Sequence, residues 1–138
     1  MARTMSGSID VSERPRVLLV DDDRVLMERV AVYLKAKNFD VTCTESVFSV
    51  AAQIGALRPN AIVLDVQMPA LSGDKVASVL SRLCTVPIVF YSAVADEDGE
   101  TLAAGHPNAC FVSKASGMRA LWEKLVEITG EKNSAVGL

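Results

Sequence analysis

Five short apolar runs alternate with amphipathic segments along nearly the whole of this 138-residue chain. The runs are almost continuously apolar, which is typical of parallel strands that are covered on both faces. Parallel strands need crossover connections, and helices usually supply them. The alternation therefore predicts an α/β fold, a doubly wound parallel sheet of five β–α repeats. We expect its strands at 17–20, 41–43, 61–64, 87–91 and 109–112.

The segments between the runs carry apolar residues at the i, i+3, i+4, i+7 spacing of an amphipathic helix. The fourth segment, 95–104, fits less well because it is acidic and contains Gly99, and a glycine inside a helix costs about 1 kcal/mol relative to alanine. We expect this helix to be the least stable and to end at Gly105 and Pro107. The residues that define the other four helices are Leu26, Val30, Tyr33 and Leu34; Val47, Val50, Ala51 and Ile54; Val76, Val79, Leu80 and Leu83; and Met118, Leu121, Trp122 and Leu125.

Composition indicates one globular domain. Half of the residues are hydrophobic, 22% are charged, and the net charge of −3 gives no basic face for nucleic acid. No apolar stretch is long enough to insert into a membrane, and the first fifteen residues lack the apolar core of a signal peptide. We therefore expect a flexible tail at 1–15, one domain at 16–130 and a short tail at 131–138 with no output domain, in a cytoplasmic protein.

The three cysteines, Cys43, Cys84 and Cys110, are odd in number and far apart. They form no C-x-x-C motif and no Cys/His spacing suited to zinc. We interpret them as small buried hydrophobic residues in a reducing compartment.

Carboxylates follow two of the predicted strands. Asp21, Asp22 and Asp23 come directly after 17–20, and Asp65 comes directly after 61–64. Like charges crowded at one edge of a sheet are unfavourable unless a cation binds there, and carboxylate oxygens suit Mg²⁺. Two simpler interpretations exist: Asp23 is a helix cap, and Asp21 and Asp22 complement a helix N-terminus.

The ends of the last two strands add a hydroxyl, from Ser92, and a positive charge, from Lys114. Asp65 itself opens a loop that Pro69 and Gly73 would shape in advance. A nucleophilic carboxylate, a metal site, a hydroxyl and a lysine together suit phosphoryl transfer.

The order of these residues resembles the receiver domain of bacterial two-component response regulators, over roughly 16–129. The resemblance implies a flavodoxin-like (βα)5 fold with strand order 2-1-3-4-5. It also implies that Asp65 accepts a phosphoryl group from a phosphohistidine on a sensor histidine kinase or phosphotransfer protein. Asp22 would bind Mg²⁺ directly and Asp21 through water, with Asp65 and the backbone carbonyl of Gln67 as further ligands.

By the same resemblance, Ser92 and Phe111 are the switch residues and Lys114 is the lysine of the site. Phosphorylation would draw in Ser92 and let Phe111 turn inward. That movement would shift the face formed by 95–104, 109–112 and 118–125 toward a downstream effector protein. Gly99 supports a mobile output face, and Trp122 is a candidate contact there. We expect a single-domain switch that is not an enzyme, with a homodimer as one possible assembly.

Three departures from the family pattern keep alternatives open. Ala115 stands where the family usually has proline after the lysine, and Phe111 lacks the usual hydroxyl. These two favour a receiver-like interaction module that does not cycle phosphate. Val94 cannot position a hydrolytic water, so we hypothesise a long-lived phosphoryl group. A phosphohydrolase usually has a second acid two residues after its nucleophile, where this chain has Gln67.

Overall fold

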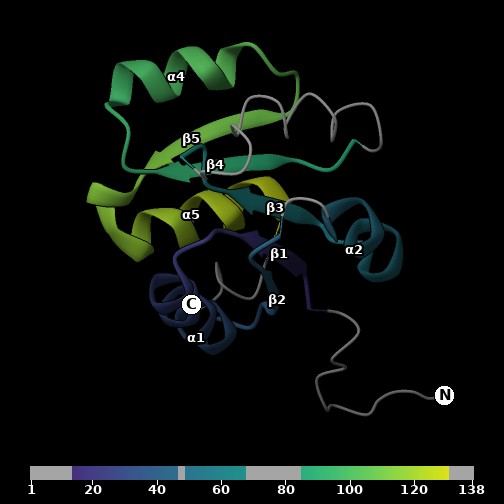
Figure 1. Ribbon diagram of the computed structural model, residues 1–138. Coiled ribbons are helices and arrows are strands. Elements are labelled where there is room, and N and C mark those ends of the chain that lie inside the picture. The colour runs from purple at the N-terminus through teal and green to yellow at the C-terminus, as the bar shows by residue number, and fades with distance from the viewer. Residues whose placement is uncertain (1–13, 47–48, 68–84, 131–138) are drawn as a thin grey trace, which may run out of the picture.

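The computed structural model describes residues 14–46, 49–67 and 85–130. It contains one five-stranded parallel sheet in the order β2-β1-β3-β4-β5, so the expected fold and strand order are confirmed (Figure 1). The predicted helix at 76–83, the loop with Pro69 and Gly73, and Cys84 lie outside the described residues. The strands are β1 (Arg16–Val20), β2 (Asp40–Thr44), β3 (Ala61–Leu64), β4 (Ile88–Ser92) and β5 (Ala109–Ser113).

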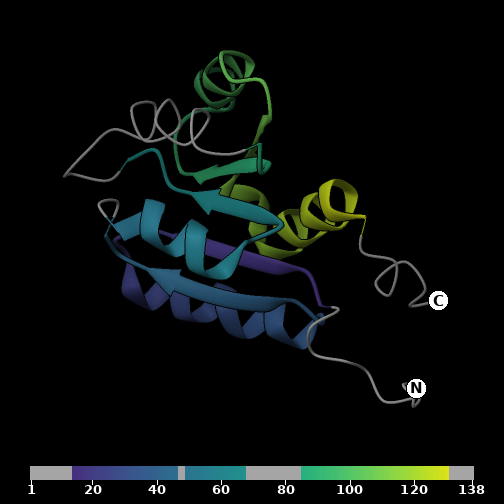
Figure 2. The ribbon, with the colours of Figure 1, turned by 90° about the vertical axis from the view of Figure 1, so that its right-hand side faces the viewer.

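The described helices pack on both faces of this sheet. Figure 2 shows α4 and α5 on opposite sides of β5. Within the described part of the chain, no helix is both long and apolar enough to cross a membrane. The helical elements are α1 (Arg24–Ala36), α2 (Val50–Leu57), α4 (Asp96–Ala104), the 3-10 turn η3 (Lys114–Ser116) and α5 (Gly117–Thr129).

The apolar residues of each strand divide into two cores because successive side chains point to opposite faces. On β1, Val17 and Leu19 pack with α1 and α5, whereas Leu18 and Val20 pack with α2 and α4. All four residues of β3 are buried. The nearly continuous apolar runs in the sequence therefore reflect cover on both sides.

Edge strand β2 departs from that pattern, and it corrects the expectation that all the cysteines are buried. Cys43 lies on β2 and is exposed, while Cys110 on β5 is partly buried. Only Val41 of β2 is buried, because an edge strand has a neighbour on one side only. The expected strand order already put this strand at the edge, whereas the burial of Cys43 was predicted from its residue type alone.

Helix α1 begins directly after the three aspartates. Asp23 is its N-cap, and the side-chain Oδ1 accepts a hydrogen bond of 3.1 Å from the backbone N–H of Leu26. The capping role predicted for Asp23 is thus confirmed. The cap fixes where the helix starts, and this leaves Asp21 and Asp22 in the short connection between β1 and α1.

Candidate functional site

The structure brings together carboxylates from two distant parts of the chain. Strands β1 and β3 are paired in parallel with Val20 opposite Leu64, so Asp21, Asp22 and Asp65 leave the sheet at the same edge. The backbone N–H of Asp65 donates to the carbonyl oxygen of Val20 over 3.1 Å, which extends the pairing to the acid itself. One oxygen from each of the three carboxylates lies within 4.8 Å of the others.

Lys114 reaches this cluster from the end of β5. Its Nζ donates to Asp21 Oδ2 over 3.0 Å and to Asp65 Oδ2 over 3.1 Å. The lysine side chain is 18% exposed, and the two carboxylates are 10% and 7% exposed, so these ion pairs are largely shielded from water. Acidic and basic groups from three strand ends therefore meet at one point.

The alanine after this lysine does not displace it. The described residues contain no cis peptide bond, and Lys114 and Ala115 enter the turn η3. The hydroxyl of Ser113 accepts a hydrogen bond of 3.1 Å from the backbone N–H of Ala115, which stabilises the turn. This hydroxyl supports the backbone at the point where the family pattern has proline.

Both buried carboxylates are held in the same way, which sequence reasoning missed. Asp21 Oδ1 accepts the backbone N–H of Asp23 over 2.9 Å, and Asp65 Oδ1 accepts the backbone N–H of Gln67 over 3.0 Å. In each acid the other oxygen accepts from Lys114. The orientation of both side chains is thus fixed by the backbone two residues further on and by the lysine. Asp22, in contrast, is exposed.

Burial and charge act in opposite directions on the ionisable groups. Burial raises the pKa of Asp21, and the N–H of Asp23 and the ammonium of Lys114 offset this only in part. Burial by itself would lower the pKa of Lys114, but its hydrogen bonds and ion pairs with Asp21 and Asp65 outweigh that effect and raise the pKa. Lys114 therefore keeps its positive charge at neutral pH.

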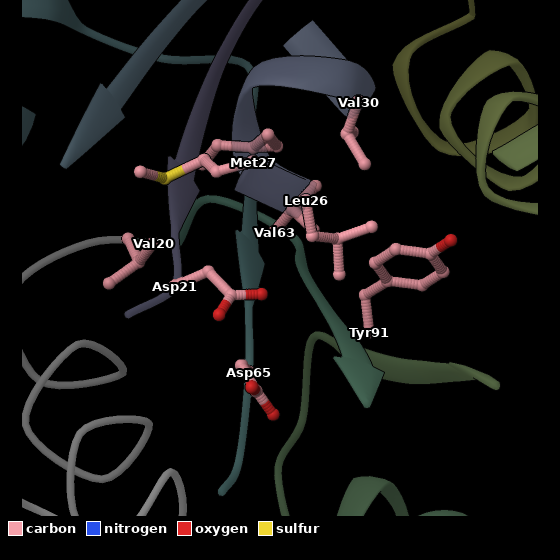
Figure 3. A pocket seen from close by; sticks show the side chains of 9 residues that line it. Val20, Asp21, Leu26, Met27, Val30, Val63, Asp65 and Tyr91 are labelled. Atoms are coloured by element: carbon pink, nitrogen blue, oxygen red, sulfur yellow. The ribbon is translucent and has the colours of Figure 1, made fainter. Parts of the chain in front are cut away.

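The cause of that burial is visible in Figure 3. Asp21 and Asp65 lie at one end of a small pocket whose other walls are almost entirely apolar, formed by side chains such as Leu26, Met27 and Val63. The pocket encloses about 10 Å³, so it holds one water at most. It is an apolar floor behind the carboxylates and leaves no room for an organic ligand.

The predicted switch residues lie on the face of the sheet that α4 covers. Ser92 is fully buried, and among the described residues its Oγ has no hydrogen-bond partner. Phe111 is 8% exposed and packs in the same core as Phe90, its register partner on β4. Ser92 follows Phe90 by two residues, so all three side chains point to one face.

The three acids fit a hard divalent cation. Their oxygens come from carboxylates, which Mg²⁺ prefers, and they lie close enough to share one ion. With the single ammonium of Lys114, three carboxylates leave a net negative charge that a cation would offset. The exposed Asp22 leaves the cluster open to solvent on one side.

The model of the response regulator receiver domain family matches residues 17–126. The chain belongs to this family. Phosphorylation on an aspartate is general in receiver domains, as is Mg²⁺ binding at an acidic pocket.

Relatives and solved structures agree with that membership. The DNA-binding response regulator MtrA of Mycobacterium tuberculosis is 34% identical over 83 residues, which are 60% of this chain and 36% of MtrA. The transcriptional regulatory protein CseB of Streptomyces avermitilis is 34% identical over 86 residues, or 62% of this chain and 37% of CseB. The chain thus spans a little over a third of the length of these relatives.

Among solved structures, the N-terminal domain of the nisin resistance regulator NsrR has a TM-score of 0.75 at 26% identity, covering 85% of this chain and 99% of that one. A CheY-like receiver domain protein from Methanospirillum hungatei has a TM-score of 0.77 at 19% identity, covering 89% and 99%. The second similarity shows the fold alone.

Proposed function

We propose that Asp65 accepts a phosphoryl group from a phosphohistidine on a sensor histidine kinase or phosphotransfer protein, in a Mg²⁺-dependent reaction. The observation that carries the proposal is the position of Lys114, which bridges Asp21 and Asp65 from a third strand end. A solvated surface lysine would not be buried between two carboxylates. Family membership supports the same reaction.

The reaction needs little from the protein beyond positioning and charge. The carboxylate of Asp65 attacks phosphorus, the bond from phosphorus to the histidine nitrogen breaks, and an acyl phosphate forms. The N–H of Gln67 and the ammonium of Lys114 hold the carboxylate in place beforehand. Lys114 can then donate to a phosphoryl oxygen, where negative charge gathers.

A Mg²⁺ ion would be held by Asp21, Asp22, Asp65 and the backbone carbonyl of Gln67. When bound, it supplies positive charge that offsets the charge on the phosphoryl oxygens. The chain's own contribution is the set of acids that binds it, two of which are already oriented by backbone N–H groups.

Ser92 would be the first residue to respond to phosphorylation of Asp65. A buried hydroxyl without a partner costs about 1–3 kcal/mol, and among the described residues Ser92 Oγ has none. A phosphoryl oxygen on Asp65 would accept its hydrogen bond. This differential interaction is what a two-state switch requires, because a ligand shifts an equilibrium only by binding one state better.

The signal would leave through the face formed by α4, β5 and α5, toward a downstream effector protein. Helix α4 is exposed at four acidic residues and has no lysine or arginine. A helix of this charge repels the phosphates of nucleic acid, so we assign α4 to a protein partner with a basic surface. The acidic residues are Asp96, Glu97, Asp98 and Glu100.

The phosphodonor would approach along α1, which starts at the acid cluster. Val25 and Val32 on this helix are 64% and 69% exposed. They line an open groove together with Tyr33 and with Met118 at the start of α5. A donor protein docked on α1 would place its phosphohistidine beside the edge of the sheet that carries Asp65.

The test is incubation with acetyl phosphate, with and without Mg²⁺, followed by intact-protein mass spectrometry. We expect one phosphoryl group on the wild-type protein with Mg²⁺, little without it, and none on Asp65→Asn. An unmodified wild-type protein at saturating Mg²⁺ would contradict the proposal and favour the interaction module that does not cycle phosphate.

A further inference from the structure

Helix α4 touches β5 at a glycine, and the contact leaves no room for any other residue. Gly99 is buried, and a Cβ atom built on its backbone would lie 2.4 Å from Cδ1 and Cε1 of Phe111 and 2.5 Å from its Cζ. Real Cβ atoms essentially never come this close to another atom. The ring edge of Phe111 therefore rests directly against the helix backbone.

The ring cannot give way at low cost. Phe111 projects from β5 into a core that includes Phe90 and Ala103, and packed interiors have few voids to receive a displaced ring. The backbone of Gly99 is equally fixed, because its N–H donates to the carbonyl oxygen of Ala95 over 3.0 Å in the first turn of α4. A larger residue at position 99 must either turn Phe111 out of this core or lift α4 away from β5.

We propose that Gly99 is a positioning residue: by lacking a side chain, it admits Phe111 to its buried position and joins the ring and α4 into one moving unit. The structural half of this inference stands on the contact alone. The regulatory half rests on the proposed phosphorylation of Asp65, since Phe111 and Ser92 share one face of the sheet. Outward movement of the ring would release α4 from its contact with β5, and inward movement would restore that contact.

This inference competes with the interpretation of Gly99 as a source of helix mobility. If glycine served only to loosen α4, alanine at position 99 would stabilise the protein, because alanine is the better helix former. If the glycine exists to receive the ring, alanine destabilises the protein by overpacking. The two interpretations differ in the sign of the effect.

Gly55 in α2 provides a matched control. It also lies inside a helix, but it is exposed and a Cβ there would meet no atom within 4 Å. We expect Gly55→Ala to raise the urea midpoint of unfolding and Gly99→Ala to lower it. Combining Gly99→Ala with Phe111→Ala should remove the clash, so that alanine at 99 then raises the midpoint relative to Phe111→Ala alone. A rise in the midpoint for Gly99→Ala in the wild-type background would overturn the inference.

A functional readout separates positioning from plain stability. Titration with beryllofluoride, a phosphoryl mimic that binds carboxylates, should show weaker binding to Gly99→Ala by about fivefold or more, the lower range for coupled sites. The ring signals of Phe111 in NMR spectra should move toward those of an exposed ring. Gly55→Ala should bind like the wild type.

The outcomes keep the two proposals apart. A wild-type protein that binds no beryllofluoride contradicts the proposed function, while the unfolding experiment still decides the contact. A wild type and a Gly99→Ala variant that bind equally well contradict the coupling between Gly99 and the site. If Phe111→Ala does not fold, Phe111→Val serves as the background, because valine has no atom at the δ, ε or ζ positions that a Cβ at position 99 would meet.

Discussion

Removing one charge from the acid cluster should stabilise the protein in the absence of metal. Asp22 is exposed, whereas Asp21 and Asp65 accept hydrogen bonds from both Lys114 and the backbone. Among the described residues, the side chain of Asp22 has no hydrogen-bond or ion-pair partner. Asp22→Asn therefore removes a repelling charge while keeping the shape of the side chain and the contacts of the other acids.

The size of this effect follows from the distances. Two like charges 4.8 Å apart repel by about 0.9 kcal/mol in bulk water and about 3.5 kcal/mol at an effective dielectric constant of 20. Asp22 is exposed, so solvent screening keeps each pair near the lower value, and attraction to Lys114 offsets part of it. We expect Asp22→Asn to stabilise the metal-free protein by about 1 kcal/mol, or roughly 4 °C in Tm.

Mg²⁺ should reverse the order of stability. A ligand at ten times its Kd stabilises the folded state by about 1.4 kcal/mol. The wild type should gain this when thermal unfolding is followed by circular dichroism in EDTA and then in Mg²⁺, and Asp22→Asn should gain little. Asp23→Asn is the matched control, because asparagine caps a helix about as well as aspartate and this variant should retain the Mg²⁺ response. An Asp22→Asn protein that gains as much Tm from Mg²⁺ as the wild type would refute the metal site.

Three further predictions concern transfer and lifetime. Lys114→Met should lower the rate of phosphorylation by acetyl phosphate at least tenfold, and it should destabilise the protein because it leaves two shielded carboxylates without their cation. An unchanged rate would show that the lysine has no part in the reaction. Val94→Glu should shorten the half-life of the phosphoryl group, since a carboxylate can orient an attacking water; an unchanged half-life, measured by loss of the mass shift, would count against the role of Val94. Val32→Glu should slow phosphoryl transfer from a protein donor but not from acetyl phosphate, whereas Ala56→Glu, at an exposed position on α2, should change neither rate. If Val32→Glu and the wild type accept phosphate from the protein donor at equal rates, the donor does not dock on the α1 groove.

The sequence predicted the sheet well because burial on both faces leaves a strong local signal. The runs ending at Val20 and Leu64 became the neighbouring interior strands β1 and β3, and the carboxyl ends of adjacent parallel strands meet at one edge of the sheet. The approach of Asp21, Asp22 and Asp65 therefore followed from the strand order, which the family resemblance supplied. The roles of these residues in metal binding and phosphorylation remain predictions.

Features that depend on three-dimensional packing were beyond the sequence. Gly99 looked like a weak point in a helix, because nothing local indicates that a phenylalanine twelve residues later fills the space above it. Cys43 was expected to be buried as a small hydrophobic residue, but it lies on the edge strand β2 and is exposed. Backbone N–H groups orient Asp21 and Asp65, and because almost every residue has such a group, the sequence could not indicate that these two would act as donors.

The most direct test of the central claim is to locate the acyl phosphate. After incubation with acetyl phosphate and Mg²⁺, borohydride reduction converts a phosphorylated aspartate to homoserine, which peptide mass spectrometry can place in the chain. The account predicts homoserine at position 65, in amounts that fall sharply when Lys114 is replaced by methionine. Homoserine at another aspartate, or none at any position while the Mg²⁺ site is saturated, would contradict it.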